Sequence, residues 1–194
     1  MGIAAVTGLG NPGSEFADTR HNVGFMVVDE LARRWRVSSF SRRHHALIAR
    51  RSGGLPVWLV KPLTFMNLSG DAVRSFCTAE DIPFSQCLIV VDDIELALGQ
   101  LRLRPRGGAG THKGLRSLVD RLGESFPRLR LGICGERVGD DLADYVLAPF
   151  ERGEAEALAS MIARAADCVE MALRDGIGRA ATEFNKSPAL PSED

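Results

Sequence analysis

The sequence lacks the marks of several common protein classes. Its four cysteines (Cys77, Cys87, Cys134 and Cys168) are widely spaced and form no CxxC pair, so we expect reduced, buried thiols and no disulfide framework. No apolar run approaches the roughly 18 residues that a membrane-spanning helix needs. The first residues also carry no basic start typical of a secretory signal. We therefore expect a cytoplasmic protein.

Aromatic residues are scarce at 6%, whereas hydrophobic residues make up 45% and charged residues 25% of the 194 residues. Aliphatic side chains must therefore fill a sizeable core, and bulk disorder is not expected. The length suits one domain better than two, and there is no repeat or linker. We predict one domain over residues 1–186, followed by a flexible tail over 187–194.

The formal net charge of −1 says nothing about partners, but the distribution of charge is uneven. Residues 102–130 hold eight basic residues against two acidic ones, and residues 136–156 hold seven acidic against two basic. This pattern indicates a positive region able to meet a polyanion. The alternative is that the charges lie scattered over several elements.

Short apolar runs predict strands, and longer stretches with apolar residues three or four apart predict helices. The predicted strands are 3–9, 46–49, 56–60, 88–91, 101–104 and 129–133, with a hairpin turn at Gly53-Gly54. The predicted helices are 23–35, 72–78, 115–122, 151–173 and 177–184, with Asn67 or Ser69 as cap of the second. Because strands alternate with helices, we predict an α/β fold with helices on both faces of a mixed sheet.

The segment Gly8–Gly13, GLGNPG, fits the dinucleotide-binding pattern GxGxxG directly after a strand. That motif requires a helix starting at the loop, whose amides meet a pyrophosphate, and an acid ending the second strand. Here no helical stripe begins before Val23, and the candidate acids, Asp29 and Glu30, lie within a predicted helix. The sequence also lacks a Gly-Lys-Ser/Thr triplet, so neither nucleotide motif is favoured.

Four polar clusters follow apolar elements: 8–24, 61–70, 92–99 and 107–115. Loops beyond strand ends are where open α/β sheets bind ligands. Each cluster alone has a structural explanation as a helix start, cap, turn or flexible connection. Together they supply a histidine able to take a proton from water, carboxylates able to orient it, and asparagine amides able to donate to an oxyanion.

Other kinds of catalysis are not indicated. The sequence holds no GxSxG nucleophile elbow and no cysteine in a nucleophile motif. Metal ligands at usable spacing are also missing, so we expect no metal and no cofactor. Direct attack by an activated water is the economical mechanism.

The four clusters, GLGNPG with TRHNVG, KPLTFMNLSG, DDIELALG and the loop before Leu115, resemble in order and spacing the bacterial peptidyl-tRNA hydrolase family. The resemblance covers nearly the whole chain. It implies a single-domain three-layer α/β/α sandwich with a mostly parallel sheet, monomeric and free of cofactors. It also implies cleavage of the ester between an N-blocked peptide and the 3′ ribose of tRNA.

Residue roles follow from the same resemblance. His21 would be the general base and Asp92 its orienting carboxylate, while Asn11 would sense acylation of the amino acid and Asn67 would place the carbonyl and the water. The residues expected to line the channel for the peptide and terminal adenosine are Phe16, Phe65, Met66, Asn67, His112 and Lys113. Arg104 and Arg130 would grip the tRNA 5′ phosphate, and the partner would be the 3′ CCA end and acceptor stem.

The sequence departs from the family at Phe16, where tyrosine is usual, and at Lys113, where asparagine is usual. A lysine lacks the acceptor of an amide but can reach a phosphate or a ribose oxygen. Two other functions remain open at this point: a non-catalytic RNA-binding protein, as some relatives of the family are, and a peptidase on a similar sandwich.

Overall fold

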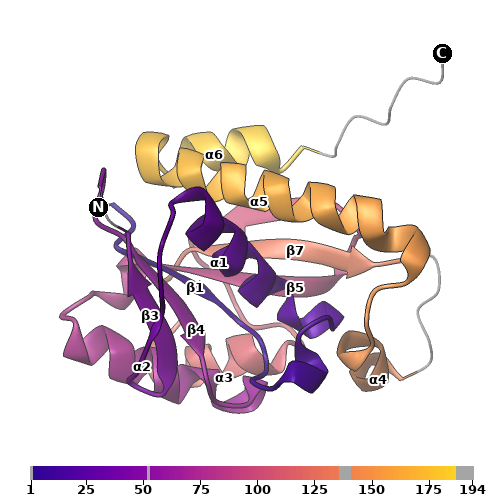
Figure 1. Ribbon diagram of the computed structural model, residues 1–194, viewed down its shortest axis with the longest axis horizontal. Helices are drawn as coiled ribbons and strands as arrows, with labels where there is room; N and C mark the ends of the chain where they lie inside the picture. Colours follow the sequence, from indigo (N-terminus) through magenta and orange to yellow (C-terminus); the bar gives the residue numbers. More distant parts are fainter. Residues whose placement is uncertain (1, 52, 136–140, 187–194) are drawn as a thin grey trace.

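The computed structural model describes residues 2–51, 53–135 and 141–186 and contains a seven-stranded sheet in the order β2-β3-β4-β1-β5-β7-β6 (Figure 1). The strands are β1 (Ala5–Gly8), β2 (Ser41–Arg43), β3 (Ala46–Arg50), β4 (Trp58–Pro62), β5 (Cys87–Ala97), β6 (Leu101–Arg104) and β7 (Arg128–Cys134). β4, β1, β5 and β7 pair in parallel, whereas β3 and β6 flank them antiparallel. The predicted mixed, mostly parallel sheet is confirmed.

Helices cover both faces of this sheet. They are α1 (Val23–Arg34), α2 (Ser69–Ala79), α3 (Lys113–Leu122), α4 (Leu142–Leu147), α5 (Ala155–Asp175) and α6 (Ile177–Phe184). α1, α5 and α6 pack on one face and α2 and α3 on the other, which confirms the three layers (Figure 1). No helix in the described ranges is long and apolar enough to cross a membrane.

Two cores result from the period-two alternation of the strands. Val6, Leu88 and Val90 face α1 and α5, whereas Ile89 and Val91 face α2 and α3. Successive side chains of a strand point to opposite faces, and both faces of this sheet are covered, so the first half of β5 (87–91) is apolar at every position. The aliphatic core expected from composition is confirmed.

Two details of the sequence prediction are wrong. β5 does not end before the aspartate pair but runs to Ala97, so Asp92 and Asp93 lie within a strand and pair with Leu131 and Gly132 of β7. α2 begins at Ser69 without a side-chain cap, and Asn67 lies in a preceding 3₁₀ turn. The Ser69 hydroxyl instead donates to the Met66 carbonyl, so turn geometry takes the place of a cap.

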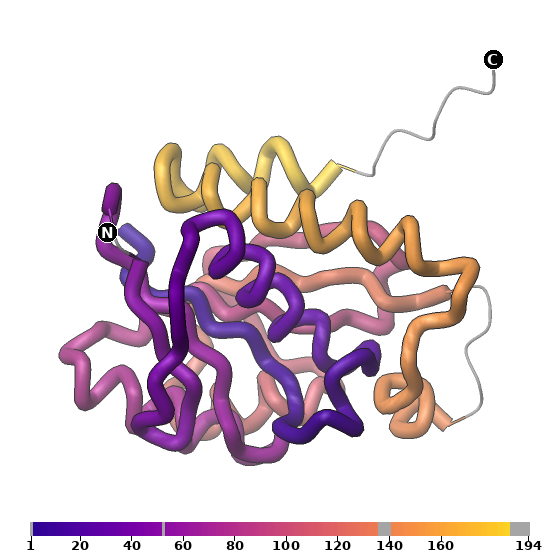
Figure 2. The backbone as a smooth tube through the Cα atoms, viewed as in Figure 1, coloured from indigo at the N-terminus to yellow at the C-terminus, as the bar shows by residue number. Residues whose placement is uncertain are grey.

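The predicted hairpin of β3 and β4 is confirmed, with Gly53 and Gly54 both at positive φ. The tail 187–194 lies outside the described residues. Figure 2 follows the chain from β1 to the segment before α1, which lies beside α4 although some 120 residues separate the two, and a bridge pairs Thr19 with Pro149.

Close contact between β1 and α1 depends on glycine. A Cβ on Gly24 would lie 2.5 Å from the Leu9 carbonyl oxygen and 2.6 Å from that of Val90, and a Cβ on Gly8 would lie 2.1 Å from the Gly24 oxygen. Such distances cannot be accommodated without backbone movement. The glycines of GLGNPG and TRHNVG therefore hold the His21 segment against the end of the sheet.

We expect Gly24→Ala to lower the free energy of unfolding by about 1–3 kcal/mol, the usual cost of overpacking. The matched control is Gly178→Ala in α6, where a Cβ meets nothing within 4 Å. That change should be neutral or stabilising by up to about 1 kcal/mol. Urea unfolding measures both, and equal effects of the two substitutions would contradict this account.

Candidate active site

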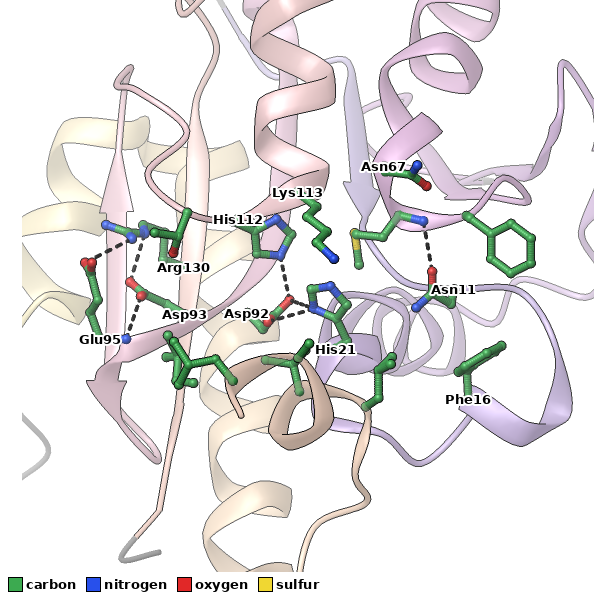
Figure 3. Close-up of a pocket in the computed structure, with 18 residues that line it drawn as sticks. Asn11, Phe16, His21, Asn67, Asp92, Asp93, Glu95, His112, Lys113 and Arg130 are labelled. Carbon is green, nitrogen blue, oxygen red and sulfur yellow. Dashed lines mark hydrogen bonds and ion pairs between the residues drawn. The ribbon is translucent and has the colours of Figure 1, made fainter. Parts of the chain in front are cut away.

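A cavity of about 660 Å³ lies beyond the carboxyl end of β1 and beside the second half of β5. Figure 3 shows the side chains that line it. Its walls come from the loop after β1, the turn before α1, the segment after β4, the second half of β5, the start of α3, β7 and α4. The residues that line it are Asn11, Phe16, His21, Phe65, Met66, Asn67, Asp92, Asp93, Ile94, Glu95, Thr111, His112, Lys113, Arg130, Leu142, Ala143, Val146 and Leu147.

Asp92 contacts two histidines at the centre of the cavity. His21 Nδ1 lies 2.9 Å from each Asp92 carboxylate oxygen, and His112 Nε2 lies 2.9 Å from Oδ1 (Figure 3). Burial alone would raise the pKa of Asp92, but the neighbouring His112 and His21 outweigh burial and hold that pKa well below its usual range. Asp92 is therefore an ionised acceptor, and His21 Nδ1 must carry the proton that it donates.

Asn11 is oriented by backbone contacts. Its Oδ1 accepts a 2.8 Å hydrogen bond from the Met66 N–H, which leaves the Nδ2 amide as a donor (Figure 3). Asn22 clamps the Asn11 backbone, since its Oδ1 accepts from the Asn11 N–H at 2.8 Å and its Nδ2 donates to the Asn11 carbonyl at 3.0 Å. Both asparagines are buried, so the amide orientation is fixed.

The loop that delivers His112 is held by a buried arginine. Arg128 donates to the carbonyls of Gly107, Gly108 and Glu124 and stacks on the ring of Phe126. Burial lowers the pKa of Arg128 to about 10, so it remains charged near neutral pH. This basic residue therefore organises a loop and does not contribute to an exposed surface.

Arg130 lies at the cavity wall in an ion pair. Its Nε is 2.8 Å from Asp93 Oδ2, and its Nη2 is 3.5 Å from Glu95. Burial raises the pKa of Asp93, against the lowering effects of the Glu95 backbone N–H and of Arg130. Arg130 retains 27% side-chain exposure, so its guanidinium can still meet a ligand at the rim.

Comparison with known proteins places this site in a family. Residues 5–192 match the peptidyl-tRNA hydrolase family. A peptidyl-tRNA hydrolase of Carboxydothermus hydrogenoformans is 44% identical over 93% of this chain and 97% of its own length, and one of Roseiflexus castenholzii is 47% identical over 97% and 89%. The chain belongs to the peptidyl-tRNA hydrolase family.

Comparison with solved structures supports the same family. A crystal structure of peptidyl-tRNA hydrolase from Acinetobacter baumannii matches with a TM-score of 0.86 and 33% identity over 94% of both chains. Family membership, enzyme class and the α/β/α sandwich predicted from the sequence are thereby confirmed. Neither the peptidase nor the non-catalytic RNA-binding alternative gains support from these matches.

All the site residues predicted from the peptidyl-tRNA hydrolase motifs line the cavity except Arg104. Arg104 is exposed on β6 opposite Arg128, while Arg102 lies opposite Arg130. Since Leu103 and Leu129 face the α5 side, these arginines share the other face of the sheet. Arg104 thus lies diagonal to Arg130, outside the cavity.

Sequence reasoning missed three features of this peptidyl-tRNA hydrolase site. The first is Asn22, which stands within TRHNVG and could have been found there. The second is the wall formed by α4, whose short apolar pattern gave no signal. The third is Arg20, which bonds Glu154 at 2.5 Å, donates to the Pro149 carbonyl and packs on two aromatic rings, tying the His21 segment to α4.

Proposed function

We propose that this chain hydrolyses the ester bond between an N-blocked peptide and the 3′ ribose of tRNA, with His21 as general base for a water molecule. The observation that carries this proposal is the His21–Asp92 pair, at 2.9 Å, in the wall of a cavity within a peptidyl-tRNA hydrolase fold. The reaction needs no nucleophilic side chain and no cofactor.

The chemistry follows from the tautomer. With the His21 proton on Nδ1 and donated to Asp92, Nε2 carries the lone pair that accepts a proton from water. The hydroxide equivalent attacks the ester carbonyl, and the imidazolium then returns the proton to the departing ribose 3′ oxygen. Asp92 stabilises the imidazolium while it exists, because its carboxylate is ionised throughout.

Asn11 is proposed to select acylated substrates. Its Nδ2 can donate to the carbonyl oxygen of the amide that blocks the amino acid, since Oδ1 is already engaged by Met66. A free aminoacyl group carries an ammonium in that place, which has no lone pair to accept. The site then separates peptidyl-tRNA from aminoacyl-tRNA by the loss of one hydrogen bond in a desolvated pocket.

Asn67 is proposed to donate to the ester carbonyl oxygen as negative charge develops on it. It is exposed and lines the cavity, in keeping with a group that waits for substrate. Phe16, Phe65 and Met66 supply an apolar surface for the peptide and for stacking of the terminal adenosine. With Phe16, the pocket offers a ring without the hydroxyl of tyrosine.

The tRNA body would be held by charge. Arg104 and Arg130 share one face of the sheet edge, as two contacts to the 5′ phosphate require, and the 3′ CCA end would enter the cavity. We further propose that the protein works as a monomer in the cytoplasm and that residues 1–186 form one domain.

His21→Asn tests the base. The asparagine keeps a donor near the position of Nδ1 for Asp92 but lacks Nε2, so turnover should fall roughly 10²- to 10⁴-fold. The assay follows release of N-acetyl amino acid from charged tRNA, and the midpoint of thermal unfolding serves as the control for folding. Activity within a few fold of the wild type would remove His21 from the role of base.

The same assay addresses the two alternative functions. A non-catalytic RNA-binding protein would bind charged tRNA without releasing amino acid. A peptidase would still cleave after RNase has removed the nucleotide moiety beyond the terminal adenosine. We expect hydrolysis by the wild type, retained tRNA binding by His21→Asn, and a marked loss of rate on the digested substrate.

Asn11→Asp tests discrimination while keeping the contact to Met66. The carboxylate can still accept from the Met66 N–H, but it replaces the Nδ2 donor by an acceptor. We expect kcat/KM for N-acetylaminoacyl-tRNA to fall roughly 10- to 100-fold, which corresponds to about 1.4–2.8 kcal/mol of lost transition-state stabilisation. The kcat/KM for free aminoacyl-tRNA should change little. An unchanged preference between the two substrates would contradict the assignment.

Lys113→Asn restores the residue usual in the family. Lys113 is the first residue of α3, where a positive charge opposes the helix dipole, so its removal should stabilise the protein by about 0.3–1 kcal/mol. We also expect higher turnover at saturating substrate, because an amide can bond the substrate at this rim. If Lys113 instead contacts a phosphate, binding would weaken and its log–log salt dependence would flatten by about 0.7.

A further inference from the structure

His112 occupies an unusual place, between a helix end and a buried carboxylate. It is the N-cap of α3, and its Nδ1 accepts from the backbone N–H groups of Gly114 at 3.0 Å and Leu115 at 3.1 Å. Its Nε2 lies 2.9 Å from Asp92 Oδ1 on the opposite edge of the ring. The His112 side chain is only 11% exposed, so little of the ring remains for substrate.

These contacts determine the tautomer. Backbone N–H groups can only donate, so Nδ1 must offer its lone pair to Gly114 and Leu115. The proton of neutral His112 therefore resides on Nε2, where it is donated to the Asp92 carboxylate, which can only accept. Both edges of the ring are satisfied by one arrangement of hydrogen atoms.

The tautomer also bears on metal binding. His21, Asp92 and His112 bring three ligand atoms within 4.8 Å of one another, the spacing of a metal site. A metal on His112 Nε2 would move the ring proton to Nδ1, where it would face the two amide N–H groups. The three side chains therefore suit two imidazole N–H groups that donate to the Asp92 carboxylate, and this arrangement disfavours a metal ion.

The helix adds a longer-range effect. α3 has ten residues, and the positive end of its dipole is carried by amides that donate to His112 Nδ1. Hydrogen bonds in a chain polarise one another, so the imidazole transmits this positive potential to Asp92. His21 lies against the same carboxylate, with the two imidazole centroids 4.9 Å apart.

We propose that His112 is a positioning residue that, in its Nε2–H tautomer, connects the N-terminus of α3 to Asp92 and thereby fixes the carboxylate that orients His21. The proposal rests on the general-base role proposed for His21. The charged groups that remain around the pair are Asp93, Glu95, Lys113 and Arg130, and Arg130 is paired with the two acids. None of these hydrogen-bonds Asp92 among the described residues.

Two substitutions separate the two edges of the ring. In His112→Asn the side-chain oxygen replaces Nδ1 and still caps α3, but no atom reaches the place of Nε2. In His112→Gln the amide nitrogen replaces Nε2 and still donates to Asp92, while the cap is lost. These two variants distinguish three roles for His112: a helix cap, a contact to substrate, and a role through Asp92.

We expect His112→Asn to keep the cap of α3 but to leave Asp92 with one partner fewer, so the thermal midpoint should fall modestly. Turnover should change more: kcat should fall roughly 10- to 100-fold with KM little changed, as for loss of one hydrogen bond to a carboxylate. We expect His112→Gln to retain most of kcat and to unfold at lower temperature. Retained kcat in His112→Asn, or a rise in KM as the only effect, would overturn the proposal.

A measurement without substrate tests the proposal even if the chain proves inactive. Imidazole ¹⁵N–¹H correlation spectra, recorded in mildly alkaline solution, report which nitrogen of each neutral histidine carries the proton. His112 should be in the Nε2–H form and His21 in the Nδ1–H form, with the His21 population becoming mixed in His112→Asn. An Nδ1–H form of His112 in the wild type would overturn the proposal, whereas absence of ester hydrolysis alone would count against the proposed function.

Discussion

The buried charge of Asp92 constrains the active site more than any other single group. Burying an ionised carboxylate at this depth destabilises the fold by roughly several kcal/mol unless hydrogen bonds and opposite charge compensate it. Compensation comes from two imidazoles that belong to separate segments, the turn before α1 and the loop before α3. Displacing either segment would leave the charge underpaired, so Asp92 couples the parts of the chain that form the cavity.

Backbone packing makes that convergence possible. Gly8 and Gly24 allow α1 to approach β1 closely, and the His21 turn is thereby held at the end of the sheet. On the other side, Arg128 binds the carbonyls of the glycine loop and so fixes the approach to His112. Tight packing and a buried cation thus position the two histidines from opposite sides of the same carboxylate.

The basic residues between 102 and 130 fall into two groups, those that form internal contacts and those that are exposed at the surface. Arg128 is buried, Arg130 pairs with Asp93 and Glu95, and Arg121 pairs with Asp71. Arg102, Arg104 and Arg106 are exposed near the same sheet edge. A positive region at this edge is therefore smaller than the count of basic residues indicates, because Asp93, Glu95 and Asp71 neutralise part of it.

The sequence determined the class of fold, the family and the polar residues to which the chemistry is assigned, because apolar periodicity and ordered polar motifs are local properties of the chain. It did not determine the length of β5, the start of α2 or the contribution of α4, since pairing with β7 and contacts with Arg20 involve residues far away in sequence. The orientation of the Asn11 side-chain amide and the ring nitrogen of His112 that carries the proton were also decided only by tertiary structure. An amide or an imidazole can donate and accept through different atoms, and its orientation depends on which backbone groups of Met66, Gly114 and Leu115 the fold brings to it.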